Sequence, residues 1–354
     1  MILATVYRGP HVESVHAGSI AVVDSTGRLL AFAGNPALRI CVRSAAKPFQ
    51  AIPLLEYGGV EEFDLRPEEV ALTCASHGGE PFHVSTAAAM LRKGEFDESD
   101  LLCGAHVPYD EKAAADLRAS GEPPSPLHNN CSGKHAGMLL ATQVMDVPSN
   151  RYIDPEHPVQ VLVRSTVAEF AGTAADELVT AVDGCGVPAF FLSLYTSAFA
   201  YARLMATAEG EETPGALERY LESASFVIES MTAFPHYVAG AWSLTTPLMQ
   251  AFDGELLAKE GAEGVYAMAL SPSLSRELTE RLRVTDDAAV AVALKIDDGS
   301  MDRGRNPVIL RTLEQLGVGL EGRAGLEHSR AGLIRNAAGT IVGEVRAEFD
   351  LEIL

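Results

Sequence analysis

Ser44 and Lys47 stand three residues apart in the tetrad Ser-Ala-Ala-Lys, a spacing that suits a nucleophile and its base. Residues three apart on a helix share a face, so the hydroxyl and the amine should project to the same side. A serine is a poor nucleophile until a base takes its proton, and a desolvated lysine can be that base. Because Pro48 cannot donate to the carbonyl four residues earlier, the helix should begin at or just before Ser44. We interpret the tetrad as a candidate nucleophile and base, and the alternative is a solvated helix start.

Two further segments gather polar side chains near helix ends. The segment Cys74–Glu80 should end a helix in a glycine-rich turn, with Ser76 and His77 at an exposed tip. The alternative is an ordinary helix C-cap. The segment His128–Gly137 is dense in polar and ionisable side chains and leads directly into an apolar helix. Such a density favours a functional role, because Asn, Cys, Lys and His together can position, ligate or protonate.

A fourth segment, Val182–Pro188, forms a glycine-flanked turn that holds Asp183 and Cys185. Asp183 could equally bond to the local backbone. Together with Cys131, Cys185 could supply two thiolate ligands for zinc, and metal chemistry alone nominates His135 as the third. The spacing matches no compact zinc motif. The remaining cysteines are more typical of small buried hydrophobic residues: Cys41, Cys74 and Cys103.

Composition limits the partners and the compartment. The net charge is -21, from 48 acidic against 27 basic residues, so nucleic acid and anionic lipid should be repelled. With 47% hydrophobic and 21% charged residues, the 354-residue chain can bury a large core. The first residues lack the pattern of a signal peptide, and the 5 cysteines are scattered. We therefore expect a cytoplasmic protein with reduced thiols, without nucleic acid or membrane partners.

The pattern of elements indicates an α+β fold. Strand-like runs occur at both ends of the chain: Ser19–Val23, Arg28–Phe32, Val265–Leu270, Val290–Ile296, Gly332–Arg335 and Ile341–Phe349. Helical patterns are predicted at Ser44–Glu56, Pro67–Cys74, Pro81–Lys93, Glu111–Ala119, Lys134–Met145, His157–Phe170, Phe190–Thr207, Gly215–Met231 and Asn306–Leu316. We expect one domain over residues 1–354. Its antiparallel sheet should come from about 1–75 and 240–354, and a helical subdomain from about 76–239.

Four motifs in this order resemble the L-asparaginase II family, the Rhizobium etli-type asparaginases. They are Arg-Ser-Ala-Ala-Lys-Pro at 43–48, Cys-Ala-Ser-His at 74–77, Asn-Cys-Ser-Gly-Lys-His at 130–135 and Asp-Gly-Cys at 183–185. The resemblance covers most of the chain, from the N-terminal hairpin to residues 295–299. It implies a fold similar to serine β-lactamases and glutaminases, which agrees with a sheet built from the terminal strands.

The resemblance also implies a pair of Ser-Lys tandems. Ser44 would be the nucleophile and Lys47 its base. Ser76 and a lysine from a later loop, Lys259 by alignment, would complete the proton relay. The implied reaction is attack on the side-chain carboxamide of L-asparagine, loss of ammonia, and hydrolysis of the acyl-enzyme to aspartate. A homodimer is implied as well.

For the metal, the resemblance implies zinc held by Cys131, Cys185 and, unusually, Lys134. This differs from the His135 suggested by donor chemistry alone, and we follow the resemblance. A ligating amine must be neutral, so its pKa must fall far below the free value. We also expect His77 and Asn130 to bind the substrate.

Charge alone suggests two more substrate contacts. Arg43 could hold the α-carboxylate of the substrate, and Asp183 could orient Lys134 or the α-amine. Several different functions also fit parts of the pattern. A glutaminase would use the same residues, whereas a penicillin-recognising enzyme would need a Lys-Thr-Gly strand and a Ser-x-Asn that are not in the expected places. A zinc-activated water hydrolase or a non-catalytic small-molecule-binding protein would also be compatible with these residues.

Overall fold

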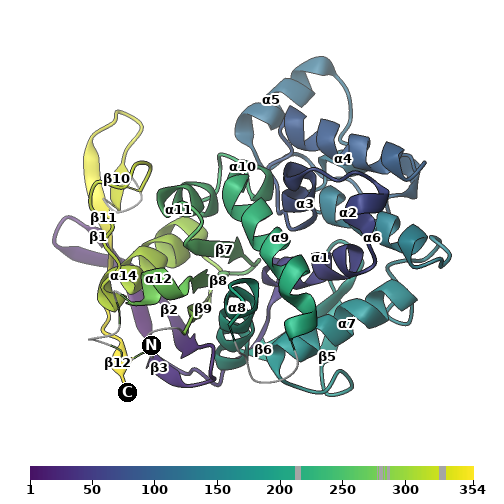
Figure 1. Ribbon diagram of the computed structural model, residues 1–354. Coiled ribbons are helices and arrows are strands. Elements are labelled where there is room, and N and C mark those ends of the chain that lie inside the picture. Colours follow the sequence, from purple (N-terminus) through teal and green to yellow (C-terminus); the bar gives the residue numbers. More distant parts are fainter. Residues whose placement is uncertain (212–216, 277, 279–281, 283, 285–287, 327–331) are drawn as a thin grey trace. The chain divides into compact units, whose positions relative to one another are not determined.

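The chain divides into two compact units. The computed structural model describes residues 1–211, 217–276, 278, 282, 284, 288–326 and 332–354 (Figure 1). One unit, called the sheet unit here, comprises Met1–Ala45, Leu192–Pro214 and Pro247–Leu354. The second, the helical unit, comprises Ala46–Phe191 and Gly215–Thr246. The boundaries differ from those expected, because residues 46–75 belong to the helical unit and residues 192–214 to the sheet unit. That the whole chain forms one domain stays a prediction.

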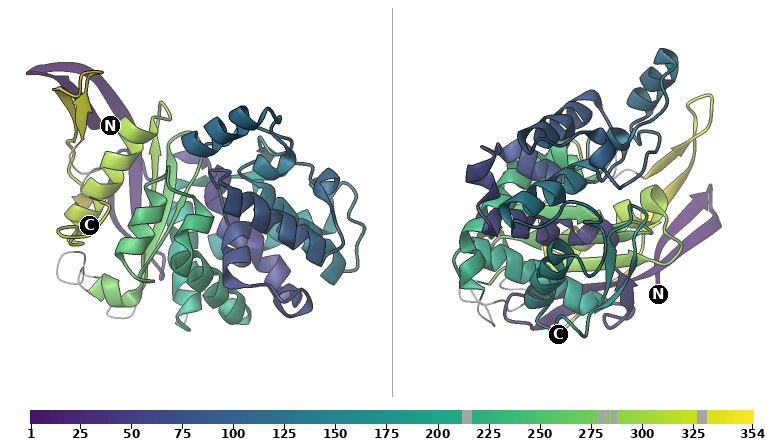
Figure 2. Two further views of the ribbon diagram at one scale, coloured as in Figure 1. Left: turned by 90° about the horizontal axis from the view of Figure 1, so that it is seen from above. Right: turned by 90° about the vertical axis from the view of Figure 1, so that its right-hand side faces the viewer.

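The sheet unit is built on an antiparallel sheet whose order is β10-β11-β1-β2-β9-β8-β7, with β3 paired to β2 and β12 to β3. Its strands are β1 (Ile2–Arg8), β2 (His11–Asp24), β3 (Leu29–Ala33), β7 (Leu256–Glu260), β8 (Val265–Leu270), β9 (Val290–Ile296), β10 (Leu333–Arg335), β11 (Ile341–Ala347) and β12 (Glu352–Ile353). Strand β4 (Arg39–Cys41) also belongs to this unit. The predicted α+β class, with an antiparallel sheet from the terminal segments, is confirmed. Figure 2 shows the two outer hairpins, β1–β2 in purple and β10–β11 in yellow, side by side.

Three adjacent strands, β7, β8 and β9, form the most buried part of this sheet. Nearly all their residues are buried, which explains their almost uninterrupted apolar sequences. Helix α8 (Leu194–Ala208) packs on β2, β8 and β9, and α14 (Asn306–Leu316) packs on β1 and β11. The described residues of this unit also form α12 (Pro272–Arg276), the π-helical turn η5 (Met301–Arg305) and most of α11 (Thr245–Ala251).

The helical unit contains α1 (Lys47–Glu56), α2 (Gly59–Glu62), α3 (Pro67–Thr73), α4 (Pro81–Lys93), α5 (Glu111–Ser120), α6 (Ser132–Val144), α7 (Pro158–Ala171), α9 (Leu221–Ala233) and α10 (Pro235–Val238). It also contains the 3₁₀ turns η2 (Glu98–Asp100), η3 (Pro126–His128) and η4 (Glu218–Tyr220), and the strands β5 (Val179–Val182) and β6 (Pro188–Ser193). Helix α6 packs against α1, α3 and α4, and α1 packs against α7 and α9. Helices α1, α3 and α6 therefore form the centre of this unit.

Two glycines explain how α6 comes so close to α3. Gly133 and Gly137 are four residues apart and thus share a face. A Cβ on Gly133 would lie 2.3 Å from the carbonyl oxygen of Leu72, and one on Gly137 would lie 2.8 Å from Thr73 Cγ2. Only glycine permits this approach. It brings the N-terminal turn of α6, which carries Lys134, next to the end of α3.

One predicted helix was partly wrong. The pattern over Phe190–Thr207 contains the end of strand β6 before α8 begins at Leu194. Ser193 caps that helix by accepting a hydrogen bond from the Thr196 backbone N–H at 2.9 Å. The helix predicted over Gly215–Met231 begins in residues outside the described range, and its described part is η4 followed by α9. Within the described residues, no helix combines the length and apolarity needed to cross a membrane.

Candidate active site

The predicted nucleophile lies in a short 3₁₀ turn. Turn η1 spans Arg43–Ala46, and α1 begins only at Lys47, so the α-helix starts later than expected. Ser44 is half-buried, and Tyr201 on α8 donates to the carbonyl oxygen of Ala45 at 2.7 Å. Arg43 has a positive φ of 49°, a left-handed conformation that a residue with a Cβ adopts at a cost. The boundary between the two units falls after Ala45, so the pairing of Ser44 with Lys47 stays a prediction.

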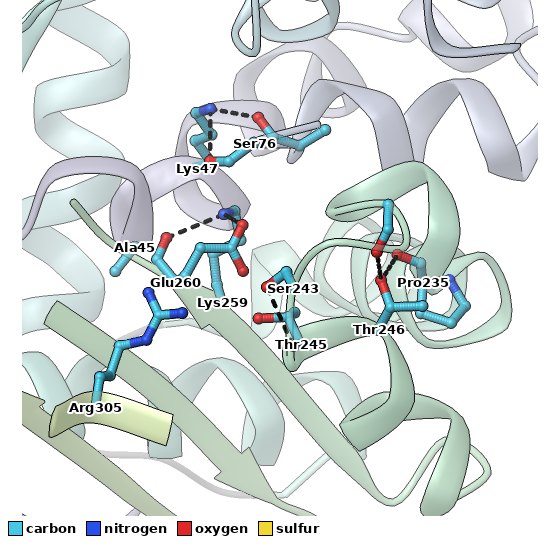
Figure 3. A network of polar contacts seen from close by, with 12 residues as sticks. Ala45, Lys47, Ser76, Pro235, Ser243, Thr245, Thr246, Lys259, Glu260 and Arg305 are labelled. Carbon is cyan, nitrogen blue, oxygen red and sulfur yellow. Dashed lines mark hydrogen bonds and ion pairs between the residues drawn. The ribbon is translucent and has the colours of Figure 1, made fainter. Parts of the chain in front are cut away.

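Lys47 and Ser76 come together inside the helical unit (Figure 3). The Lys47 side chain is fully buried, and its Nζ donates to Ser76 Oγ at 3.1 Å and to the backbone carbonyl of Ala75. The Ser76 backbone N–H in turn donates to the carbonyl of Val238 at 2.8 Å, which fixes the segment after α3. A buried amine beside a buried hydroxyl is an arrangement that can transfer a proton. The expected exposed tip is wrong, because residues 74–79 are all buried.

His77 is held by two hydrogen bonds that define its tautomer. The Gly79 backbone N–H donates to His77 Nδ1 at 3.1 Å. Nδ1 is therefore the acceptor nitrogen, and Nε2 carries the proton that it donates to Ser132 Oγ, 2.9 Å away. Burial, followed by the nearby charge of His83, lowers the pKa of His77 well below its ordinary value. A neutral ring with both nitrogens occupied orders this loop, and a substrate contact through His77 stays a prediction.

The predicted zinc ligands also converge in the helical unit. Cys131 immediately precedes α6, Lys134 lies in its first turn, and Cys185 lies in the turn between β5 and β6. Lys134 Nζ donates to Cys185 Sγ at 3.0 Å, and the Cys131 sulfur accepts hydrogen bonds from Cys185 and Lys47. All three side chains are buried. Lys47 thus contacts both the hydroxyl of Ser76 and the sulfur of Cys131.

The charges of this cluster follow from these contacts. The hydrogen bond from Cys185 lowers the pKa of Cys131 well below its ordinary value, and the charges of Lys47 and Lys134 lower it further. Cys185 is the donor of that pair, so its pKa is raised. Burial alone would lower the pKa of Lys134, but the two sulfurs outweigh it and raise the pKa. The cluster therefore pairs a Cys131 thiolate with a charged Lys134.

This donor set fits a thiophilic cation. Two sulfurs and one amine point to the same place, and a metal there would displace the proton of Lys134. Across the described residues, no three side chains of His, Cys, Asp or Glu are grouped to hold a metal. His135, the alternative ligand, shares a hydrogen bond between its Nδ1 and the Tyr152 hydroxyl at 2.7 Å, and its role as a ligand stays a prediction. Lys134 is the third donor that this geometry offers beside the two sulfurs.

Asp183 and Asn130 lie in the loops around this cluster. Asp183 Oδ1 accepts a hydrogen bond from the Gly184 backbone N–H at 2.7 Å, the local turn bond considered above. Its charge adds to that of the two sulfurs in raising the pKa of Lys134. The Asn130 carbonyl accepts from the His77 backbone N–H at 3.2 Å. Substrate binding by Asp183 and Asn130 stays a prediction.

Lys259 belongs to the sheet unit. It lies within strand β7, not in a loop, and its side chain is fully buried. Its Nζ donates to Glu260 Oε1 at 2.8 Å and to the Glu260 backbone carbonyl at 3.0 Å. Sequence reasoning missed Glu260 and its buried neighbour Arg305. The available signal was a pair of charges at the end of a strand that otherwise reads Leu-Leu-Ala.

Residues 4–347 match the L-asparaginase II family. The chain belongs to this family. The predicted resemblance is confirmed over nearly the whole length, and membership supports an amidohydrolase that acts on a small molecule. No curated protein sequence matches the chain significantly.

Several solved structures are similar at low identity. A crystal structure of Mglu has 15% sequence identity and a TM-score of 0.44, with 90% of this chain and 72% of that chain covered. Mglu in its glutamate form has 14% identity and a TM-score of 0.36, with coverage of 90% and 65%. A Bacillus glutaminase has 12% identity and a TM-score of 0.38, with coverage of 86% and 92%.

Proposed function

We propose that this protein hydrolyses L-asparagine to L-aspartate and ammonia through an acyl-serine intermediate, on a serine β-lactamase-like variant of the α+β fold. Membership in the L-asparaginase II family supports the amide substrate. The observation that carries the proposal is the buried contact between Lys47 Nζ and Ser76 Oγ, beside the Cys131 sulfur. Burying an amine among a hydroxyl and a thiolate adds little to the stability of a fold, so these groups point to a shared chemical role.

The proposed reaction has two balanced steps. The Ser44 oxygen bonds to the side-chain carboxamide carbon while Lys47 takes the hydroxyl proton. The carbon–nitrogen bond then breaks as the departing nitrogen receives that same proton, passed on from Lys47 through Ser76 and Lys259, and leaves as ammonia. A water molecule next adds to the ester carbon and gives a proton back to Ser44, which releases aspartate. The left-handed backbone at Arg43 supports this assignment, because strain of this kind gathers at functional turns.

Zinc is part of the proposal. Cys131, Lys134 and Cys185 would hold it, after Lys134 has lost its proton. When bound, the cation would supply positive charge that orients the polar groups of the substrate. Arg43 and Asp183 would hold the α-carboxylate and the α-amine of the substrate, with His77 and Asn130 beside them. A homodimer is proposed from the family resemblance.

The test is ammonia release from asparagine and, separately, glutamine. Ser44→Ala should lower kcat on the preferred amide by at least about 1,000-fold, because it removes the atom that forms the acyl bond. Ser85→Ala is the matched control, since Ser85 is an exposed serine whose hydroxyl bonds only to the carbonyl of Phe82 in α4 among the contacts described. A Ser44→Ala protein with normal turnover would exclude the acyl-serine route.

The same assay separates the competing functions. A glutaminase would release ammonia faster from glutamine than from asparagine. A zinc-activated water hydrolase would lose all activity on chelation, whereas a Ser-Lys enzyme should keep part of it if zinc only orients the substrate. A non-catalytic binding protein would release no ammonia from either amide.

A further inference from the structure

Three charged side chains are buried together at the end of strand β7. The exposed fractions are 0% for Lys259, 3% for Glu260 and 1% for Arg305. Burying a charge is costly unless an opposite charge and hydrogen bonds compensate for it. The neighbouring strand β8 is apolar except for the Tyr266 hydroxyl. These charges therefore need an explanation beyond the packing of the sheet.

The ends of the two adjacent side chains converge although neighbours on a strand normally face opposite sides. Glu260 is the last residue of β7, where the chain begins to turn. The Lys259 amine reaches the Glu260 carboxylate at 2.8 Å and the Glu260 backbone carbonyl at 3.0 Å, so two acceptors from one residue fix its position. A lysine amine on its flexible four-carbon stem would otherwise sample many rotamers.

Arg305 approaches Glu260 from turn η5 (Figure 3). Its guanidinium lies 5.4 Å from the ring centre of Tyr266, which is the cross-strand partner of Glu260. Burial lowers the pKa of Arg305, and the negative charge of Glu260 partly offsets this. Nε and Nη2 donate to Asn306 Oδ1, each at 3.2 Å. Arg305 is thus a fixed cation whose field acts on the same carboxylate that binds Lys259.

We propose that Glu260 is a positioning residue for the Lys259 amine, and that Arg305 holds the Glu260 carboxylate in the orientation that this requires. The inference rests on the proposed function, in which Lys259 carries a proton. One carboxylate serves two cations, and arginine does not give up its proton. Because Glu260 shares its negative charge between Lys259 and Arg305, it aligns the Lys259 amine without fully neutralising it. An ion pair that served folding alone could be replaced by apolar residues at no loss.

The experiment compares Glu260→Gln and Glu260→Ala in the full-length protein. Gln keeps an acceptor oxygen for the Lys259 amine, so kcat should fall about 10-fold, whereas Ala removes it and should cost about 100-fold. KM should change less than twofold, because Glu260 does not contact the substrate. Arg305→Met should lower kcat by about 10-fold, since Glu260 loses the cation that holds it.

Glu69→Gln is the matched control. Glu69 is also a fully buried glutamate whose Oε2 accepts from a lysine, Lys93, at 2.7 Å. It caps helix α3 by accepting from the Arg66 backbone N–H at 2.8 Å, so its loss should lower the unfolding temperature. Glu69→Gln should therefore lose stability without losing kcat, the behaviour expected of a buried ion pair with a purely structural role.

A double-mutant cycle with Lys259→Met decides whether Glu260 acts through the lysine. If it does, Glu260→Gln has no further effect on kcat in the Lys259→Met background. Equal losses in both backgrounds overturn the inference, as does an unchanged kcat for Glu260→Gln. If Glu260→Ala does not fold, Glu260→Gln and the cycle still decide. Ser44→Ala is measured in parallel, so an active Ser44→Ala enzyme refutes the proposed nucleophile whatever the cycle gives.

Discussion

The two units each bury a lysine completely, but they surround it differently. Lys47 in the helical unit donates to the Ala75 carbonyl, the Ser76 hydroxyl and the Cys131 sulfur. Lys259 in the sheet unit donates to the Glu260 carboxylate and carbonyl. A carboxylate holds an ammonium firmly in place, whereas a hydroxyl can exchange a proton with an amine. We therefore expect Lys47 to exchange a proton with serine and Lys259 to present a fixed, pre-aligned charge.

The largest expected difference between the two units is in kcat, when each of the two lysines is replaced in turn. Lys47→Met should lower kcat by about 1,000-fold, because the proposed base for Ser44 is lost. Methionine fills nearly the same volume as lysine, so no cavity is left in the core. Lys259→Met should cost less, about 100-fold, since the Ser76 hydroxyl and water can replace part of the relay.

The measurement is steady-state ammonia release, with circular dichroism to confirm folding. Equal losses for the two variants would contradict the distinction between the lysines. A greater loss of kcat for Lys259→Met would reverse the distinction and would indicate that Lys259 of the sheet unit acts as the base.

The local motifs were easier to predict than their surroundings. The tetrad at Ser44, the polar start of α6 and the turn at Cys185 were visible because reactive residue types stand close together in the chain. Strands β8 and β9 were predicted with the observed bounds, since a short apolar run between turn signals has few competing interpretations. The sulfur–amine cluster itself joins residues more than 50 positions apart. Donor chemistry suggested the pair Cys131 and Cys185, and only the family resemblance added Lys134.

What the sequence could not reveal depends on tertiary burial. The loop at Ser76 looked like an exposed tip because it is short, polar and rich in glycine. It is buried because α6 packs onto the end of α3 through Gly133 and Gly137, a contact between segments that no local pattern encodes. Glu260 and Arg305 were missed for the same reason. Each resembles a surface charge until the fold places it in the sheet core.

The sulfur ligands provide the next sharpest test of the comparison. Cys131→Ser should weaken zinc binding by at least about 100-fold, because a hydroxyl is a far poorer ligand than a thiolate. Cys41→Ser is the matched control, since Cys41 is a partly exposed cysteine of strand β4 in the sheet unit. The measurement is titration with zinc followed by calorimetry. Equal zinc affinity in the Cys131→Ser and Cys41→Ser proteins would remove Cys131 from the ligand set.

Each unit also contains a carboxyl–imidazole pair. The smallest expected difference between the units is in the stability that these two pairs contribute. Glu80 Oε2 lies 2.8 Å from His83 Nδ1 in the helical unit, and Asp298 Oδ2 lies 2.7 Å from His16 Nδ1 in the sheet unit. His83 Nε2 already donates to the carbonyl of His236 at 2.8 Å. The contact with Glu80 is therefore made through the other ring nitrogen of His83, Nδ1.

A fall in pH should destabilise the Glu80–His83 pair of the helical unit more than the Asp298–His16 pair of the sheet unit. Burial tends to raise the pKa of Glu80, but the hydrogen bond and charge of His83 outweigh it, so the folded-state pKa lies below the ordinary 4.5. A carboxyl group whose pKa is depressed in the folded state contributes stability that is complete above its unfolded-state pKa and is lost as the pH falls through its folded-state pKa.

Glu80→Gln should lower the unfolding free energy by about 1 kcal/mol at pH 7, because Glu80 is only half buried and water screens the pair. Its urea-unfolding stability should also fall less steeply below pH 4.5 than that of the parent protein. Asp298→Asn, with a side chain that is 49% exposed, should change it by less than about 0.5 kcal/mol. An equal pH slope for Glu80→Gln and the parent protein would show that the contact with His83 does not lower the pKa of Glu80.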